Sequence, residues 1–288
     1  MEEHSEAVLK RGSLGNDEGD NDAATAMIWS LEEAAQKQTQ QIGVSACGAT
    51  AVVDVLQALG FNVTPQIVER CVKTNLRKNE APLPEYLLSR SIAGATHAQL
   101  IEGAEKASDG KVVGRFFHMY PERQIHLPKW LSHWISIGAV PVATMNMQLA
   151  VPKGEEIPDA WHHQMIFGVM PDFLCMINPL EVEKTSVVKQ RLCSDSVLLI
   201  RKEDILIRLS EDTKLSALSQ VQDDPRWDQL DVPGQVGQMI YEEITPDEGT
   251  NALHVLIPAA YKSGITVFAV KDTDTAQELL DVPELPLQ

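Results

Sequence analysis

Residues 41–60 read QIGVSACGATAVVDVLQALG, and this stretch sets the expected fold of the chain. Apolar residues after Cys47 recur at the spacing of one helix face, namely Val52, Val55, Leu56 and Leu59. Gly60 is a natural stop for such a helix, because glycine readily adopts the conformation that ends one. The pattern therefore predicts a helix with Cys47 in its first turn, where the positive end of the backbone dipole favours a thiolate.

The segments around this helix change character along the chain. Further helical patterns are expected over residues 23–40, in a helix opened by Thr64-Pro65, and over residues 84–93 and 96–107. Beyond them KVVGRFFHMY, AVPVATMNM, WHHQMIFGVM and DFLCMINPL read as strands, with a short helix in LPKWLSHWISIG. Helices followed by strands are typical of an α+β domain, as opposed to alternating βαβ units.

The composition divides the chain into three expected parts. Residues 1–23 are acidic and rich in Gly, Ser and Asn, and this composition predicts disorder. Residues 24–210 are expected to form the α+β domain. From residue 211 the sequence becomes acidic and interrupted, so residues 211–288 are expected to form a C-terminal extension with three short strand-like runs, QMIYEEI, ALHVLIP and SGITVFAV.

Charge and cysteine usage exclude several classes of function. The net charge of -17 and the pI of about 4.8 argue against binding to nucleic acid or to an anionic membrane surface. The polar N-terminus is not a secretory signal, and no run of about 18 apolar residues predicts a membrane span. The four cysteines form no CxxC pair, which indicates a cytoplasmic protein with reduced thiols and no expected metal or cofactor.

A reactive thiolate also needs a base and a group that orients the base. The stretch AWHHQMIFGVM places two histidines at the start of a strand, and the next strand ends at Asn178. Because a β-hairpin brings the start of its first strand close to the end of its second, His162 and Asn178 are expected to meet, with the Asn178 side-chain oxygen accepting from the imidazole. Gln41 is expected to fold back beside Cys47 as a second donor to an oxyanion, and Gly48 is expected to let substrate approach closely.

These residues resemble the pattern of the papain-like cysteine peptidases. The resemblance rests on Gln41, five residues before Cys47-Gly48 at a helix start, on a distant His162, and on Asn178 sixteen positions later. It is strongest to the bacteriocin-processing branch, which cleaves after a double-glycine leader. In that branch a glycine follows the histidine by six positions, as Gly168 does here, and the orienting residue precedes a proline.

The resemblance covers roughly residues 40–205 and implies both a fold and a mechanism. The family fold has a helical half that carries the cysteine and an antiparallel β half that carries the histidine. By position, the resemblance implies that Cys47 is the nucleophile, His162 the base and acid, Asn178 the orienting residue and Gln41 the oxyanion donor.

Either of the two neighbouring histidines could serve as the base. Adjacent strand residues point to opposite faces, so only one of them can face Cys47. The spacings to Gly168 and Asn178 favour His162, which would leave His163 on the other side. A zinc site at the pair is disfavoured, because no third ligand has a matching spacing. Cys71, Cys175 and Cys193 are each flanked by apolar residues and are expected to be structural.

The predicted activity is that of a cytosolic cysteine peptidase, which cleaves a peptide or amide bond through a thioester acyl-enzyme. Its expected partner is a peptide or protein substrate. The same residues would also support deamidation or acyl transfer to an amine, because only the acceptor differs. The remaining alternative is a catalytically inactive papain-like adaptor that binds a protein partner through residues 211–288.

Overall fold

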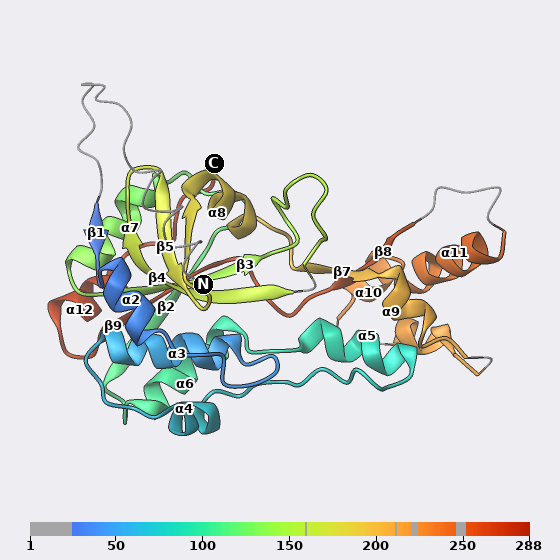
Figure 1. Ribbon diagram of the computed structural model, residues 1–288, viewed down its shortest axis with the longest axis horizontal. Helices are drawn as coiled ribbons and strands as arrows, with labels where there is room; N and C mark the ends of the chain where they lie inside the picture. The colour runs from blue at the N-terminus through green and yellow to red at the C-terminus, as the bar shows by residue number, and fades with distance from the viewer. Residues whose placement is uncertain (1–24, 159, 211, 221–223, 246–251) are drawn as a thin grey trace.

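A sheet of seven strands lies at the centre of the protein, and helices pack on both of its faces (Figure 1). The computed structural model describes residues 25–158, 160–210, 212–220, 224–245 and 252–288. The segment 1–23, for which the sequence predicts disorder, lies outside the described residues. Helices combine with an antiparallel sheet, as expected for an α+β protein.

The strands are β1 (Ala26–Met27), β2 (Val112–His118), β3 (Val140–Asn146), β4 (Trp161–Val169), β5 (Phe173–Ile177), β6 (Glu181–Lys184), β7 (Val197–Arg201), β8 (His254–Pro258) and β9 (Gly264–Val270). The helices are α2 (Leu31–Lys37), α3 (Cys47–Ala58), α4 (Pro65–Cys71), α5 (Leu83–Ile92), α6 (His97–Ala107), α7 (Leu127–Ser136), α8 (Thr185–Leu192), α9 (Lys202–Leu206), the 3-10 helix η1 (Leu215–Gln220), α10 (Arg226–Gln229), α11 (Val232–Ile244) and α12 (Asp274–Asp281). None of the described helices is long and apolar enough to cross a membrane.

The central sheet has the order β2-β9-β3-β4-β5-β6, and β1 pairs with β4 outside this path. All of these pairings are antiparallel. Strand β9 comes last in the chain and yet lies between β2 and β3, so that Phe268 pairs with Gly114 on one side and Val140 on the other. The sheet is therefore complete only when the C-terminal strand is in place.

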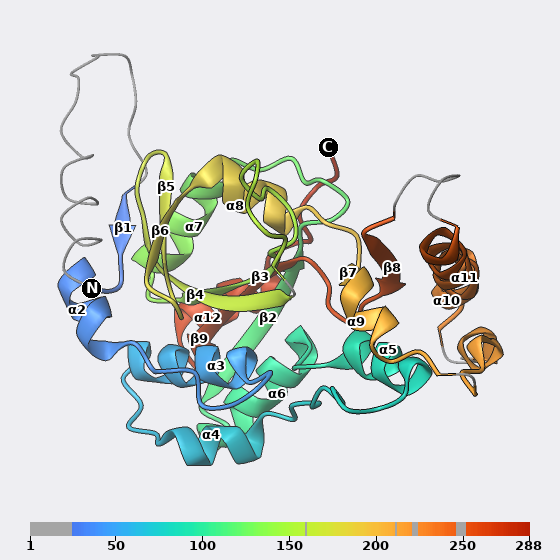
Figure 2. The ribbon, with the colours of Figure 1, turned by 45° about the vertical axis from the view of Figure 1, so that its right-hand side comes forward.

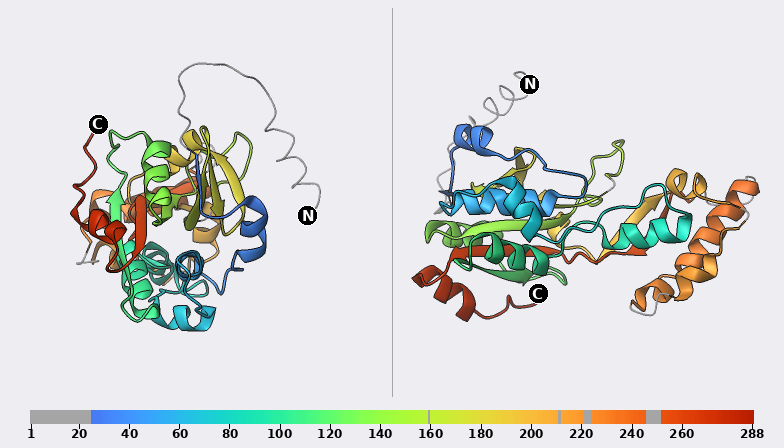
Figure 3. Two further views of the ribbon diagram at one scale, coloured as in Figure 1. Left: turned by 90° about the vertical axis from the view of Figure 1, so that its left-hand side faces the viewer. Right: turned by 90° about the horizontal axis from the view of Figure 1, so that it is seen from below.

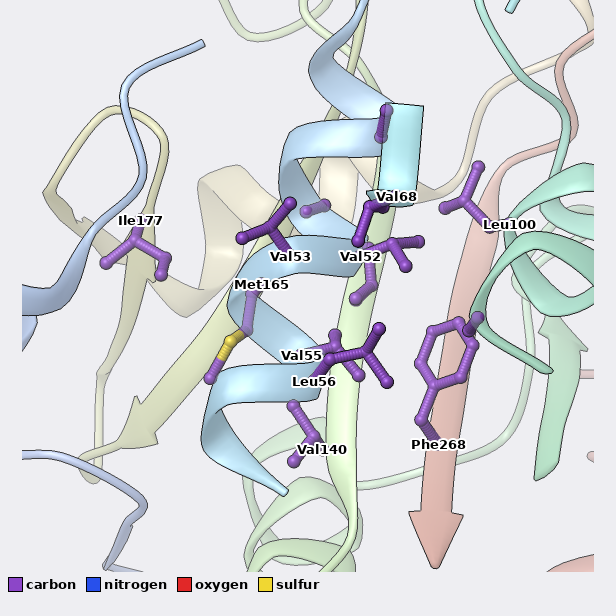
Figure 4. Close-up of a cluster of buried hydrophobic side chains, with 14 of the residues drawn as sticks. Val52, Val53, Val55, Leu56, Val68, Leu100, Val140, Met165, Ile177 and Phe268 are labelled. Carbon is purple, nitrogen blue, oxygen red and sulfur yellow. The ribbon is translucent and has the colours of Figure 1, made fainter. Parts of the chain in front are cut away.

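The alternation of side chains along the strands divides the core in two. On β3, Val140 and Val142 face a cluster formed with α3, α4 and α6, whereas Ala143 and Met145 face a cluster formed with α7, α8 and α12. Figure 4 shows the first cluster, in which side chains of α3 pack over the strands. Helix α3 is thus held by its apolar residues against the sheet, which fixes the position of Cys47 at its start.

A second lobe lies beyond one end of the sheet (Figures 2 and 3). Strands β7 and β8 pair with each other, and α5, α9, η1, α10 and α11 surround them. The lobe has its own core, which includes Leu87, Ile200, Trp227, Val236 and Ile257. Helix α5 belongs to this lobe, although it lies between α4 and α6 in the sequence.

The expected boundary near residue 211 does not separate an extension from a domain. Residues 264–270 form a central strand, and α12 packs its Leu279 into the core below α7. Residues 197–201, expected in the first domain, instead pair with 254–258 in the second lobe. The chain enters the second lobe, leaves it and re-enters it. This pairing between distant segments is invisible in composition, which is why the sequence suggested a boundary.

The segment 23–40 also differs from its expected single helix. Ala26 and Met27 pair with Val169 and Gly168 of β4, so the chain is extended there. The helix begins only after Ser30, whose side chain accepts from the Glu33 N–H while the Glu33 carboxylate accepts from the Ser30 N–H. This capping box sets the helix start, and the residues before it pair with the sheet instead.

Candidate active site

Cys47 is the first residue of α3 and is 6% exposed. The chain reaches it through Ser45, which has a φ of 60°, and Ala46, whose N–H donates to the Gly43 carbonyl at 3.2 Å. This tight turn directs the chain into the first turn of α3. The first N–H groups of a helix have no acceptor within it, and here the N–H of Gly48 acts on the Cys47 thiol.

Gly48 has a different role from the one expected. A Cβ at this position would lie 2.9 Å from Leu100 Cδ1, 3.2 Å from Ala95 Cβ and 3.2 Å from His163 Cδ2. The missing side chain therefore allows α3 to pack closely against α6 and β4, and it does not open a path for substrate.

The environment of Cys47 favours its thiolate. Burial by itself raises the pKa of the thiol, but the hydrogen bond and positive charge of His162 lower it, and the N–H groups of His163 and Gly48 add to this. The net result is a pKa below the ordinary value. In contrast, burial raises the pKa of Cys175 to about 11 and also raises that of Cys193.

His162 shows the complementary shift. Burial lowers its pKa, but the hydrogen bond and charge of Cys47, together with the Asn178 carbonyl, outweigh this and raise it. His162 Nε2 lies 2.5 Å from the Asn178 backbone oxygen. Because a carbonyl oxygen can only accept, Nε2 carries the proton, and Nδ1 is the nitrogen left for the thiol. The two shifts both favour the thiolate–imidazolium pair over the neutral pair.

Asn178 meets His162 as the hairpin of β4 and β5 predicts, but through a different atom. The sequence suggested the side-chain oxygen, whereas the structure uses the backbone carbonyl. Asn178 has a φ of 70°, and its buried Nδ2 has no hydrogen-bond partner among the described residues. The orienting group of His162 is therefore the peptide bond of residue 178, turned toward the ring by a left-handed backbone conformation.

Replacing Asn178 with glycine is therefore expected to leave the active thiol intact. Glycine keeps the carbonyl and adopts a positive φ without a steric cost. The rate of Cys47 alkylation by iodoacetamide between pH 5 and 9, measured by peptide mass spectrometry, should stay within about threefold of wild type. A side-chain orienting role would instead show as a loss of about tenfold or more near neutral pH.

Gln41 is exposed, and its amide nitrogen donates to the Gly43 carbonyl at 2.8 Å. It therefore does not reach toward Cys47 as expected. Instead it lines a groove of about 510 Å³ whose opposite wall contains His162, Asn178 and Pro179. The remaining lining comes from the end of α2, namely Ala35 and Gln36, and from the segment that follows it, namely Gln38, Thr39 and Gln40.

His163 is fully buried, and both nitrogens of its ring have hydrogen-bond partners. Its Nε2 lies 2.8 Å from the Ala95 carbonyl and its Nδ1 lies 3.0 Å from Thr144 Oγ1. Burial lowers the pKa of His163 to about 4, so its ring is neutral at pH 7. The structure thus places His162 beside the thiol and His163 between α6 and the sheet.

Two aromatic residues lie beside Cys47. Trp161 and Tyr261 stack with centroids 5.8 Å apart and, with Cys47, line a small cavity of about 30 Å³. Tyr261 follows β8 and belongs to the second-lobe core, so the lobe contributes directly to the site. Trp161 could be suspected, because it precedes His162 at the start of the strand, but no sequence signal connects Tyr261 with Cys47.

Gly94 is expected to be the position most sensitive to a small side chain near this cavity. It has a φ of +88°, and a Cβ would lie 1.7 Å from the Tyr261 hydroxyl. Gly94→Ala should lower the free energy of unfolding by about 3–5 kcal/mol, from backbone strain plus overpacking. Gly110→Ala is the matched control, because its φ is +75° but nothing lies within 4 Å. Urea unfolding should separate the two variants; equal losses would contradict the close approach of Tyr261.

The described residues contain no group of three His, Cys, Asp or Glu side chains that could hold a metal ion. A thiol lies at a helix start, the imidazole of His162 lies beside it, and a groove begins at this imidazole. Such an arrangement can attack an electrophilic carbon with sulfur and deliver a proton on the side of the groove.

Comparisons with known proteins add little to this geometry. No family model matches the chain, and a search of curated proteins finds no match. Among solved structures, one match is a proposed C39-like peptidase from Bacillus anthracis. It shares 15% identity over 58% of this chain and 91% of that chain, with a TM-score of 0.38. A likeness at this TM-score carries no argument, so the function must be inferred from the site itself.

Proposed function

We propose that the protein is a cysteine peptidase-type hydrolase of the papain-like kind, with Cys47 as nucleophile and His162 as acid and base. The observation that carries this proposal is the hydrogen bond between His162 and the Cys47 thiol at the start of α3, with the imidazole held from its other side by the Asn178 carbonyl. This contact lowers the pKa of the Cys47 thiol and raises that of His162. Both shifts favour a charged pair before substrate arrives. It needs no further base to generate the nucleophile.

The reaction proposed for this site has two stages. The Cys47 thiolate attacks the carbonyl carbon of an amide, and the C=O electrons move to the oxygen. When the oxyanion collapses, the C–N bond breaks, His162 gives its proton to the leaving nitrogen, and a thioester remains. In the second stage His162 takes a proton from water, the hydroxide attacks the thioester, and the Cys47 thiolate is released with the acid.

Stabilisation of the oxyanion is assigned to donors near the start of α3. The Cys47 N–H lies in the first turn, where backbone donors are not used by the helix. Gln41 would become a second donor if its amide rotated away from the Gly43 carbonyl. This role is proposed from its place on the groove wall opposite His162.

The shape of the site supports a peptide substrate. His162 protonates the leaving nitrogen, so the leaving segment lies on its side, where the groove of about 510 Å³ runs. Gln36, Gln38, Gln40 and Gln41, whose side chains end in carboxamides, line the groove. Carboxamides both donate and accept hydrogen bonds, as peptide groups require. On the other side, the cavity of about 30 Å³ beside Cys47 leaves room only for a small acyl-side group.

The proposed setting is the cytoplasm. All four cysteines, Cys47, Cys71, Cys175 and Cys193, are free thiols, which supports a reducing compartment. A peptide or protein substrate in that compartment is the proposed partner.

Peptide-library cleavage tests the proposed activity. Wild type and Cys47→Ala are incubated with a proteome-derived peptide mixture, and new termini are identified by mass spectrometry. We expect termini that require Cys47, in a variant whose circular dichroism matches wild type. Cleavage that persists in Cys47→Ala would contradict the proposal. Products joined to an added amine, without free acids, would instead indicate acyl transfer.

A further inference from the structure

Asp54 is a buried acidic residue on the same helix as the nucleophile. It lies seven residues after Cys47, which is about two turns of α3, so both side chains are on one face. Asp54 is fully buried, and its Oδ1 accepts from the Thr39 N–H at 2.9 Å. Its Oδ2 has no hydrogen-bond partner among the described residues. Burying a carboxyl group without partners for both oxygens lowers the stability of the fold.

Thr50 makes a second contact of the same kind from the intervening turn. Its Oγ1 accepts from the Ile42 N–H at 3.3 Å and donates to the Ala46 carbonyl at 2.9 Å. Asp54 and Thr50 therefore bind the segment between α2 and α3 at Thr39 and Ile42. These two points lie on either side of Gln40 and Gln41.

The segment between these two points is the wall of the groove. Thr39, Gln40 and Gln41 line it opposite His162 and Asn178. Residues 39–42 have no regular secondary structure, and the N–H groups of Thr39 and Ile42 bond to side chains of α3. The position of the wall relative to Cys47 is thus set by side chains on the helix that carries Cys47.

A packing role alone does not account for Asp54. Its neighbours Val53 and Val55 belong to the apolar cluster, and an apolar residue would fill the same space at less cost. Burial raises the pKa of Asp54 to about 7, against the opposing contacts of Thr39. What the buried carboxyl provides in return is an acceptor for the Thr39 N–H.

We propose that Asp54 is a positioning residue that, through Thr39, holds the Gln40–Gln41 wall in register with Cys47 for the reaction. The inference rests on the proposed function. Asp54 does not touch the reacting atoms. Its effect is therefore expected in steps that use the wall and not in the reactivity of the thiol itself.

Two probes separate these effects. Iodoacetamide reports the thiolate alone, because sulfur displaces iodide at a saturated carbon and no oxyanion forms. The peptide aldehyde acetyl-alanyl-glycinal adds reversibly: a C–S bond forms, the carbonyl electrons move to oxygen, and the oxygen takes a proton from His162. Its affinity therefore depends on donors near the oxyanion, including the wall.

The comparison uses Asp54→Leu, Asp54→Asn and a control, Val55→Ala, which perturbs α3 in the core without touching the wall. We expect Asp54→Leu to bind the aldehyde at least about tenfold more weakly, with an iodoacetamide rate within about twofold of wild type. Asp54→Asn keeps the acceptor oxygen and should restore binding to within about threefold. Val55→Ala should leave both readouts unchanged.

Each other outcome overturns the inference. The inference is wrong if Asp54→Leu binds the aldehyde as tightly as wild type does. It is also wrong if Asp54→Asn fails to restore binding, or if Val55→Ala loses as much affinity as Asp54→Leu. If Asp54→Leu does not fold, Thr50→Val takes its place, because it removes the second contact to the segment. It must then weaken aldehyde binding without slowing the reaction with iodoacetamide. A wild type whose Cys47 does not react with either probe would defeat the proposed function and the inference with it, whereas a failure confined to the variants defeats only the inference.

Discussion

Replacing His162 with alanine is expected to raise the pKa of the Cys47 thiol above its ordinary value of about 8.5 and to slow alkylation at pH 6.5 by at least about fiftyfold. Burial raises this pKa, and His162 is the largest opposing influence. Without the imidazolium, burial dominates. At pH 6.5 a thiol with a pKa of 8.5 is only about 1% ionised, whereas the wild-type thiol keeps a larger ionised fraction.

The measurement is the pH dependence of iodoacetamide labelling at Cys47, followed by peptide mass spectrometry. His133→Ala is the control, because His133 is half exposed on α7 and pairs with Glu278 away from the site. It should retain the wild-type profile. A profile that is unchanged in His162→Ala, or one that is lost instead in the His133 variant, would refute the assignment of His162.

Removing residues 264–288 is expected to abolish folding, although most of the chain would remain. The deletion takes away β9, which pairs with β2 and β3 in the middle of the sheet, and α12. Phe268, fully buried in the core cluster that includes α3 and α6, is expected to contribute about 3–5 kcal/mol by itself. Whole domains are stable by only about 5–15 kcal/mol, so the loss of the complete strand exceeds what the remaining fold can tolerate.

Circular dichroism and limited proteolysis of the truncated chain check this prediction. A matched pair of point variants reports the same effect in a folded protein: Phe268→Ala should lose about 3–5 kcal/mol in urea unfolding, and Phe173→Ala, 37% exposed on β5, about 1 kcal/mol. If the truncated chain unfolded cooperatively with native circular dichroism, residues 264–288 would be an extension after all.

Local signals in the sequence predicted the elements that depend on local chemistry. Thr96 caps α6 together with Gln99, Pro65 opens α4, and the helix after Cys47 begins where its pattern indicates. Helix α11 was instead expected to contain a strand, in the run QMIYEEI over residues 238–244. In the structure Asp231 caps this helix, and its buried face packs into the second lobe.

In the site, too, the contact set by a local hairpin was predictable, whereas contacts that depend on distant parts of the chain were not. Hairpin geometry predicted that residues 162 and 178 would meet, since their separation is set by the length of two paired strands. It could not predict that the carbonyl of Asn178 would be used, because that depends on the φ of one residue. Nor could spacing bring Tyr261 to Cys47, because this contact depends on how the second lobe packs against β4.

Intact-protein mass spectrometry during turnover of p-nitrophenyl acetate tests the central claim most directly. Wild type is predicted to gain one acetyl group, located at Cys47 by peptide mapping, which disappears once the ester is exhausted. His162→Ala should acquire this group slowly and Cys47→Ala should lack it at this site. An acetyl group that forms elsewhere while Cys47 stays unmodified, or one that forms on Cys47 equally fast without His162, would contradict a Cys47–His162 hydrolase.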